Sequence, residues 1–396
     1  MIVFVNILGA SMILPVLPLY AQRQFGLTPE TITLLVSSFF AAQFLAGPTI
    51  GRLSDTYGRL PILIISQIGT TISFVMLALA QGPFVLFSAR ILDGITGGNI
   101  IVAQAYVTDI TPREKRTEAL GYIFAAFGLG FIFGPALGGV LSAAFGPRFP
   151  FWAAAGAALL TVTLTWVTLD ETVTPEQREA NRHVKRGGLQ PAEIIQNYPL
   201  LLILVAGFVG QFALGLLQST FSLYADAVLF QGHSEEATNL GIGLLLAVVG
   251  VSQFATQTAF LPRLVPRLGE AKLVIIGTLV RSMGLVIYAI VSSPWLGAFG
   301  SLFFAAGLGM MMPSLQSLTT RTVADEVRGG VLGLYQSTVS LSTIFSTAVA
   351  GLLYAVSPRT PYWSGFFLSL LSLIPAYVIW QRSREGSLSP EQVPAG

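Results

Sequence analysis

Stretches of about 20 apolar residues recur along this 396-residue chain, and short polar segments separate them. A helix needs roughly 20 residues to cross the hydrocarbon core of a membrane, and irregular backbone cannot face lipid. The sequence therefore predicts an all-α polytopic membrane protein. We expect twelve transmembrane helices, at approximately 3–20, 33–50, 61–80, 84–107, 119–142, 149–169, 199–223, 239–260, 272–291, 294–318, 331–354 and 362–381.

The composition excludes several other classes of protein. Hydrophobic residues make up 53% of the chain and charged residues only 10%, against roughly 25% charged residues in soluble proteins. The chain has no cysteine, and its two histidines, His183 and His233, lie in separate polar segments. It therefore offers neither a set of metal ligands nor a nucleophile–base pair, and we expect no enzyme activity, metal or cofactor. The positive charges are scattered, so nucleic acid is not an expected partner.

Lys and Arg residues predict the orientation, because cytoplasmic loops carry an excess of them. With both termini on the cytoplasmic side, sixteen of the 21 Lys and Arg residues fall in cytoplasmic segments. Only Arg23, Arg148 and Arg359 fall in outer segments, and Arg90 and Arg281 lie inside spans. We therefore expect a multi-pass protein, in a bacterial inner membrane, with both ends in the cytoplasm.

A charged segment divides the spans into six and six. We predict an N-terminal six-helix bundle at 1–169, a cytoplasmic linker at 170–198, a C-terminal six-helix bundle at 199–381 and a cytoplasmic tail at 382–396. The two halves repeat weakly, since Gly94 to Gly121 resembles Gly307 to Gly333 in spacing. Pseudo-symmetric halves are typical of secondary transporters, whose substrate site lies between the repeats near the membrane midplane.

The turn after the second span has a specific glycine spacing. It reads GRLSDTYGRLP at 51–61, in which Gly51 and Gly58 permit a tight turn and Asp55 can cap a helix N-terminus. A loop needed only to set orientation would explain the arginines but not this spacing. The segment resembles the loop signature of the major facilitator superfamily, although Thr56 and Leu60 replace basic residues of that pattern.

The resemblance implies a conformational gate made of Gly51, Asp55, Gly58, Arg59 and Asp109. The matching aspartate of the family lies against the start of span eleven, which is near Val331 here. Since all the charged members belong at one membrane level, we expect Arg59 to pair with Asp109. In the corresponding turn of the second half, at 262–272, Pro266 stands where the aspartate would be, so a weaker gate is expected there.

Span four holds an ionisable pair. Arg90 and Asp93 are one helical turn apart and can pair, and Asp93 lies about ten residues from either end of the span. A charge at that depth is costly and marks a functional candidate, so we predict that Arg90 and Asp93 couple protons to transport. A buried structural ion pair is the alternative. Arg90, Asp93 and Gly94 resemble the fourth-span motif of the same superfamily, and the closing Asp109-Ile110-Thr111 resembles tetracycline-type exporters.

Span five carries a stripe of small residues. It consists of Gly121, Gly130, Gly134, Pro135, Gly138 and Gly139. Such a stripe lets another helix approach closely, and ordinary packing of small residues is the alternative explanation for it. The pattern resembles the motif of the drug:proton antiporter branch of the superfamily. This resemblance is strong over residues 1–142 and only architectural from 199 onward.

Polar side chains within other spans are candidates for the substrate cavity. They are Asn6, Gln43, Gln104, Gln211, Gln218, Arg281, Gln316 and Tyr335. Arg281 is about 15 Å deep by helical rise and needs a partner or a wet cavity. Single glutamines more often form hydrogen bonds between helices than contacts with a ligand.

Together these features imply a monomeric transporter that exports a small amphipathic organic compound in exchange for protons by alternating access. Its partners would be this small-molecule substrate, protons and the lipid bilayer. A facilitator or exporter of sugars, lipids or other metabolites is the main alternative. A non-transporting receptor or scaffold is a remote one, because the antiporter stripe and an ionisable residue near the membrane midplane argue against it.

Overall fold

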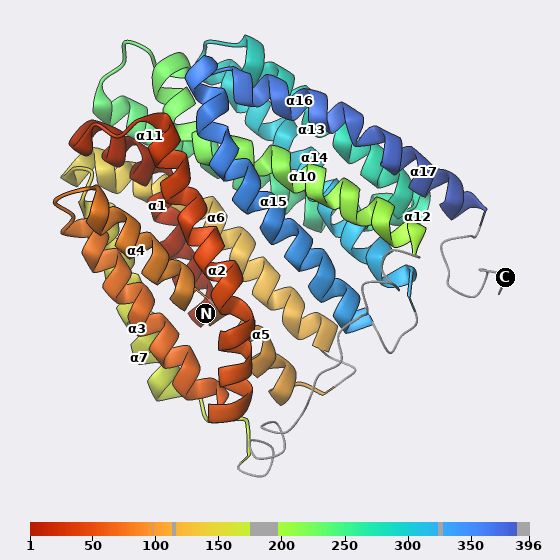
Figure 1. Ribbon diagram of the computed structural model, residues 1–396, viewed down its shortest axis with the longest axis horizontal. Coiled ribbons are helices and arrows are strands. Elements are labelled where there is room, and N and C mark those ends of the chain that lie inside the picture. The colour runs from red at the N-terminus through yellow and green to blue at the C-terminus, as the bar shows by residue number, and fades with distance from the viewer. Residues whose placement is uncertain (98, 113–115, 175–196, 324–327, 386–396) are drawn as a thin grey trace. The chain divides into compact units, whose positions relative to one another are not determined.

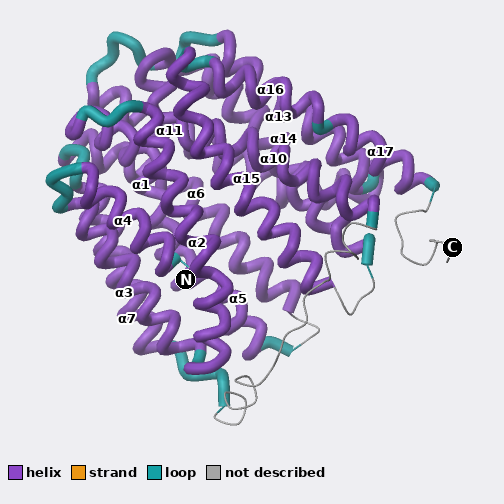
Figure 2. The backbone as a smooth tube through the Cα atoms, in the orientation of Figure 1, coloured by secondary structure: helices purple, strands orange, loops and turns teal. Residues whose placement is uncertain are grey.

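The computed structural model describes residues 1–97, 99–112, 116–174, 197–323 and 328–385. Figure 2 shows that helices joined by short turns make up this part of the chain, with no strand within those ranges. The all-α prediction is confirmed. Most of the predicted linker at 170–198, and the predicted tail from residue 386 onward, lie outside the described residues.

The described chain forms two compact units, which are Met1–Lys185 with Ser222–Gly250, and Arg186–Phe221 with Val251–Gly396. Figure 1 labels the helices. The first unit contains α1 (Ile2–Phe25), α2 (Pro29–Tyr57), α3 (Arg59–Ala78), α4 (Pro83–Thr96), α5 (Asn99–Ile110), α6 (Arg116–Phe145), α7 (Phe149–Thr168) and most of α11 (Glu235–Ala255). The second contains most of α10 (Tyr198–Tyr224), with α12 (Leu261–Leu268), α13 (Glu270–Ile290), α14 (Pro294–Arg321), α15 (Arg328–Val356), α16 (Thr360–Leu371) and α17 (Leu373–Arg384).

Within the described residues, 11 helices are long and apolar enough to cross a membrane. They coincide with predicted spans, and α16 and α17 together form the last of them. The predicted span at 84–107 is the exception, because it is divided into α4, of 14 residues, and α5, of 12 residues. Glycine is a poor helix former, and α4 ends where Gly97 follows Thr96.

The glycine stripe of α6 packs against α1, as predicted. A Cβ atom at Gly130 would lie 2.5 Å from a side-chain carbon of Ile7, and one at Gly134 would overlap the hydroxyl of Ser11. At Gly138 it would collide with the backbone carbonyl of Met12. The Ser11 hydroxyl donates a hydrogen bond of 2.8 Å to the Gly130 carbonyl, so the two helices are in backbone-close contact.

A second face of α6 packs against α11. A Cβ atom at Gly139 would lie 2.6 Å from the carbonyl oxygen of Asn239, and one at Gly243 would lie 2.6 Å from that of Pro135. The Asn239 amide also donates to the Ser142 hydroxyl over 3.2 Å. The motif thus serves two contacts, because Gly130, Gly134 and Gly138 face α1 whereas Gly139 faces α11. Gly121 lies in α6, but its surroundings lie outside the described residues.

In the second unit, α13 packs along α14 and α16. Glycines of α13 permit its close approach to α14. A Cβ atom at Gly284 would lie 2.5 Å from the backbone nitrogen of Phe304, and one at Gly277 would lie 2.7 Å from the Gly307 carbonyl. This contact brings the backbones together around Arg281, whose side chain is completely buried.

We predict that Gly134→Leu abolishes transport while the chain still inserts into the membrane, because a side chain there meets Ser11 and the carbonyl of Leu8. Overpacking of this kind typically costs about 1–3 kcal/mol. The matched control is Gly156→Leu in α7, where a Cβ atom meets nothing within 4 Å. Transport and membrane expression would be measured for both variants, and wild-type transport by Gly134→Leu would contradict the packing argument.

Candidate functional site

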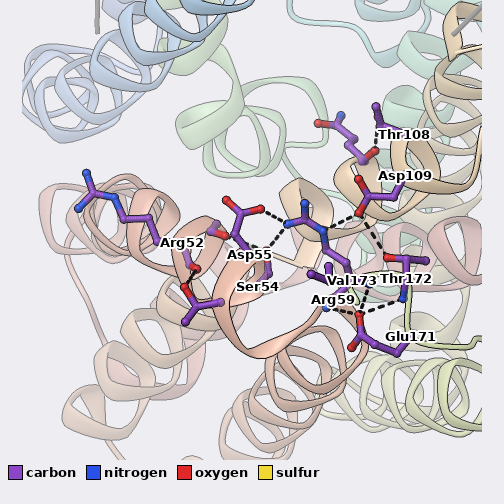
Figure 3. Close-up of polar contacts among 12 residues, drawn as sticks. Arg52, Ser54, Asp55, Arg59, Thr108, Asp109, Glu171, Thr172 and Val173 are labelled. Atoms are coloured by element: carbon purple, nitrogen blue, oxygen red, sulfur yellow. Dashed lines mark hydrogen bonds and ion pairs between the residues drawn. The ribbon is translucent and has the colours of Figure 1, made fainter. Parts of the chain in front are cut away.

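The turn between α2 and α3 gathers a cluster of charged and polar side chains, which Figure 3 shows. The Arg59 guanidinium lies 2.5 Å from the Asp55 carboxylate and 2.9 Å from the Asp109 carboxylate at the end of α5. It also donates to the Ser54 hydroxyl over 2.8 Å. The predicted pairing of Arg59 with Asp109 is therefore confirmed. One guanidinium holds the ends of α2, α3 and α5 together.

Glu171, which follows α7, caps the N-terminus of α3. Its carboxylate accepts hydrogen bonds from the backbone N–H groups of Arg59, at 2.9 Å, and Leu60, at 3.3 Å. It also accepts from the N–H groups of Thr172 and Val173 in its own turn. A carboxylate at a helix N-terminus satisfies otherwise unpaired donors and favours the positive end of the helix dipole.

The capping role at the start of α3 therefore belongs to Glu171, because the carboxylate of Asp55 is occupied by Arg59. Gly58, the residue before α3, adopts a positive φ of 111° that side chains rarely tolerate, which explains the second glycine of the motif. Glu171 lies in the predicted linker and was not among the predicted site residues. A carboxylate three residues past the end of α7 was the available signal.

The Arg90–Asp93 pair lies within α4, as predicted. The two side chains are 2.7 Å apart, and Asp93 is only 6% exposed. The Arg90 guanidinium also stacks over the ring of Phe39 in α2, with 4.2 Å between its central carbon and the ring centroid. Its Nε atom is buried without a hydrogen-bond partner. Arg90 thus contacts a carboxylate and an aromatic face at the same time.

Close contact between α2 and α4 positions this pair. A Cβ atom at Gly94, the residue after Asp93, would collide with the backbone carbonyl of Phe39. One turn later the Gln43 side chain donates a hydrogen bond of 3.3 Å to the Gly97 carbonyl, at the end of α4. Gln43, a predicted cavity residue, therefore ties α2 to the point where the fourth span is divided.

Arg281 in the second unit is fully buried and has neutral partners. Its guanidinium donates to the Gly210 carbonyl and to the Ser369 hydroxyl, both over 2.9 Å. Its Nε atom has no hydrogen-bond partner, and no carboxylate within the described ranges forms an ion pair with it. The partners that Arg281 was expected to need are thus neutral groups of α10 and α16, and not an acidic residue.

The other predicted cavity residues have varied surroundings. The Gln211 side chain donates to the Thr343 hydroxyl over 2.9 Å, which is the interhelical bond that single glutamines commonly form. Tyr335 is 4% exposed and its hydroxyl contacts the sulfur of Met312. Asn6, Gln104 and Gln218 are half-buried, whereas Gln316 is exposed. Because these residues belong to two units, a cavity that they share stays a prediction.

The corresponding turn of the second half has its own ion pair. Glu270, the first residue of α13, lies 3.0 Å from the guanidinium of Arg321 at the end of α14, and it accepts a hydrogen bond of 2.6 Å from Ser317. Arg59 and Asp109 occupy the corresponding helix ends in the first half. The two halves therefore have an ion pair between the same two helix ends, with the positive and negative residues exchanged. The sequence did not predict this pair, because the expected acidic residue of the turn was an aspartate at the position of Pro266.

Arg23, at the end of α1, forms a further charged contact in the first unit. It lies 2.6 Å from Asp226, in the π-helical turn Ala225–Leu229, and 3.1 Å from Glu235 at the start of α11. Arg23 was predicted only to lie in an outer segment, with no partner named for it. Since Asp226 and Glu235 belong to the second half of the sequence, this contact is long-range and no local pattern could have predicted it.

Comparisons with known proteins place this architecture in a family. A family model, the Major Facilitator Superfamily, matches residues 1–255 and 228–395. The chain belongs to the major facilitator superfamily. It is therefore a multi-pass membrane transporter and not an enzyme. The match covers both halves, so the resemblance beyond residue 199 is more than architectural, contrary to the expectation from its motifs.

Similar superfamily members include resistance proteins. The chain is 29% identical to the tetracycline resistance protein, class E, of Escherichia coli over 92% of this chain and 88% of that protein. It is 30% identical to the class C protein of the same organism, over 92% and 90%. It is 26% identical to multidrug resistance protein 2 of Bacillus subtilis (strain 168), over 96% and 94%.

Solved structures agree on the fold. A nucleoside transporter, NupG, superposes with a TM-score of 0.76 at 13% identity, over 96% of each chain. A D-xylose–proton symporter superposes with a TM-score of 0.77 at 16% identity, over 96% of this chain and 95% of that one. At these identities the similarity extends to the major facilitator fold alone.

We predict that Glu171→Ala exposes the start of α3 to local opening. The change removes the acceptor for the N–H groups of Arg59 and Leu60, and loss of a helix cap typically costs about 0.5–2 kcal/mol. Hydrogen exchange measured by mass spectrometry is expected to accelerate in the peptide that contains these amides. Glu385→Ala, at an exposed site after α17, is the control. Unchanged exchange in Glu171→Ala would show that Glu171 is not the cap.

Proposed function

We propose that this protein exports a small amphipathic organic compound in exchange for protons, by alternating access. The buried pair of Arg90 and Asp93 is the observation that carries the proposal. An ionisable pair with an exposure of 6% at Asp93, within the predicted fourth span, is costly and is a functional candidate by default. The similarity to tetracycline and multidrug resistance proteins supports a drug-like substrate.

The contacts of Arg90 suggest how a proton is bound and released. A buried carboxylate is stabilised when a guanidinium lies beside it, whereas burial favours the neutral carboxyl when the guanidinium moves away. The ring of Phe39 can hold Arg90 while Asp93 is protonated, because a cation stacked on an aromatic face remains partly compensated. Proton binding at Asp93 would then leave the ring of Phe39 as the partner of Arg90.

The chemical class of the substrate is inferred from the predicted cavity residues, which include few charged groups. The predicted cavity residues are six amides, Tyr335 and one arginine, so neutral polar groups predominate among them. A few placed polar groups in a mainly hydrophobic pocket suit a largely apolar molecule with one or two polar groups. A hydrophobic or weakly cationic compound therefore fits better than a multiply charged metabolite. A cationic substrate could replace the proton as the partner of Asp93, which would link substrate release to proton binding.

We also propose that the cluster of Asp55, Arg59 and Asp109 stabilises the state that is closed on the cytoplasmic side. Asp55 would lie at the N-terminal end of span eleven, near Val331, in that state. The ion pairs of Arg59 support the proposal, because they fix the carboxylate of Asp55 at the end of α2. In a state open to the cytoplasm, this contact with span eleven would be absent.

The coupling proposal predicts that Asp93→Asn eliminates uphill export. Asparagine keeps the shape of the side chain but cannot titrate, so substrate binding and downhill exchange are expected to persist. Transport would be measured in proteoliposomes with and without an imposed pH gradient, with tetracycline and a lipophilic cation as probes. Glu236→Gln, at an exposed carboxylate, is the control that should leave gradient-driven export intact.

Gradient-driven accumulation by Asp93→Asn, with an unchanged dependence on external pH, would contradict the proposal. Asp93 would then be a structural partner of Arg90 only.

The gate proposal predicts a longer separation between the ends of spans two and eleven in Arg59→Gln. Because the chain has no cysteine, spin labels can be attached to Thr56→Cys and Gly333→Cys without other changes. Removing the guanidinium takes away the ion pair that fixes the Asp55 carboxylate, which should shift the distance distribution towards the cytoplasm-open state. Arg52→Gln removes an exposed arginine of the same turn and is the matched control. Equal distributions for the two variants would contradict the gate.

A further inference from the structure

Three cations in the second unit contact aromatic rings near the ends of α10, α13 and α17. The Nζ atom of Lys272, in the first turn of α13, lies 5.8 Å from the ring centroid of Trp380 in α17. The central guanidinium carbon of Arg384, the last residue of α17, lies 5.5 Å from the same ring. The guanidinium of Arg382 lies 4.7 Å from the ring of Tyr198, at the start of α10.

Two of these cations share one ring without a counter-charge. Lys272 and Arg384 are both within the distance of about 6 Å at which a cation is attracted to an aromatic face. Neither forms an ion pair with a carboxylate in the described part of the chain, although Glu385 directly follows Arg384. Like charges repel, so an anion placed between them would be stabilised by both.

An exposed apolar stripe leads along α16 and α17 to this place. Phe367, Leu370, Ile374 and Tyr377 are exposed by 57%, 37%, 65% and 49%. Their spacing of three and four residues continues through position 381 to Arg384, so all lie on one face of the helix. In a membrane protein such a face contacts lipid chains. The cations therefore lie where this lipid-facing stripe reaches its polar end.

We propose that this surface binds an anionic phospholipid. The phosphate of the headgroup lies between Lys272 and Arg384 beside Trp380, and an acyl chain lies along the stripe. Basic pockets at the cytoplasmic ends of membrane helices are suited to anionic headgroups, and tryptophan is enriched at the same depth. A free phosphate ion would use the cations but gain nothing from the apolar stripe. The proposal depends only on the protein's being embedded in a membrane, not on proton coupling.

Native mass spectrometry of the full-length, delipidated protein tests this site. Phosphatidylglycerol should bind more tightly than phosphatidylcholine with the same acyl chains. The double variant Lys272→Gln with Arg384→Gln should lose about 30-fold in affinity for phosphatidylglycerol, as expected for two cations near a membrane surface. The control is Arg263→Gln with Arg267→Gln, which removes two exposed cations of α12 that contact no aromatic ring in the described part of the chain.

A second variant separates the site from a general effect of charge. Trp380→Leu keeps both cations but removes the ring that positions them, so it should also weaken phosphatidylglycerol binding and reduce the rise in melting temperature that this lipid gives the wild type. The melting temperature without lipid reports whether each variant folds. Equal losses in the two double variants, or displacement of the lipid by inorganic phosphate, would overturn the proposal.

Discussion

Hydrocarbon solvates charge poorly, and every ionisable group in the spans of this transporter has to be compensated by its neighbours. Arg90 is compensated by Asp93 and by the ring of Phe39. Among the described residues, the Arg281 guanidinium is compensated by the Gly210 carbonyl and the Ser369 hydroxyl, which are both neutral. These contacts need helix backbones that approach each other closely, and glycines permit this beside both arginines. Gly94 allows α4 to pack closely on α2 near Arg90, and Gly307 allows α14 to pack closely on α13 beside Arg281. Charge compensation and small-residue packing therefore depend on each other.

The cost of placing a charge away from water also bears on the helix ends. That cost is lower there than in the middle of a span, so the two halves can place the positive and the negative residue of a pair at opposite positions. Arg59 with Asp109 in the first half, and Glu270 with Arg321 in the second, connect corresponding helix ends with opposite signs. The ion pair occupies the same position in both halves, but its positive and negative residues are exchanged. This is consistent with an internal repeat whose halves have diverged. Such ion pairs are only partly buried, so each contributes modestly to stability, and a change of state can break them at low cost.

Much of the fold was predictable because the membrane limits the chain to helices of a narrow range of lengths. The span boundaries, the Arg90–Asp93 pair and the contact of the Gly130, Gly134 and Gly138 stripe with another helix all follow from local sequence. The cap provided by Glu171 and the contact of Arg23 with Asp226 do not, because they depend on residues distant in the chain. The division of span four after Thr96 was not predicted either, although Gly97 marks it locally. The neutral partners of Arg281 were also inaccessible, since serine and a backbone carbonyl leave no signature in the sequence.

The central claim is that substrate and proton compete for the buried Arg90–Asp93 pair. Calorimetry of substrate binding to the purified transporter, in buffers of different ionisation enthalpy, tests it most directly because the buffer takes up any proton that is released. The account predicts a heat of binding that varies with the buffer in the wild type and is independent of the buffer in Asp93→Asn. Equal dependence on the buffer in both proteins, or none in either while substrate still binds, would contradict it.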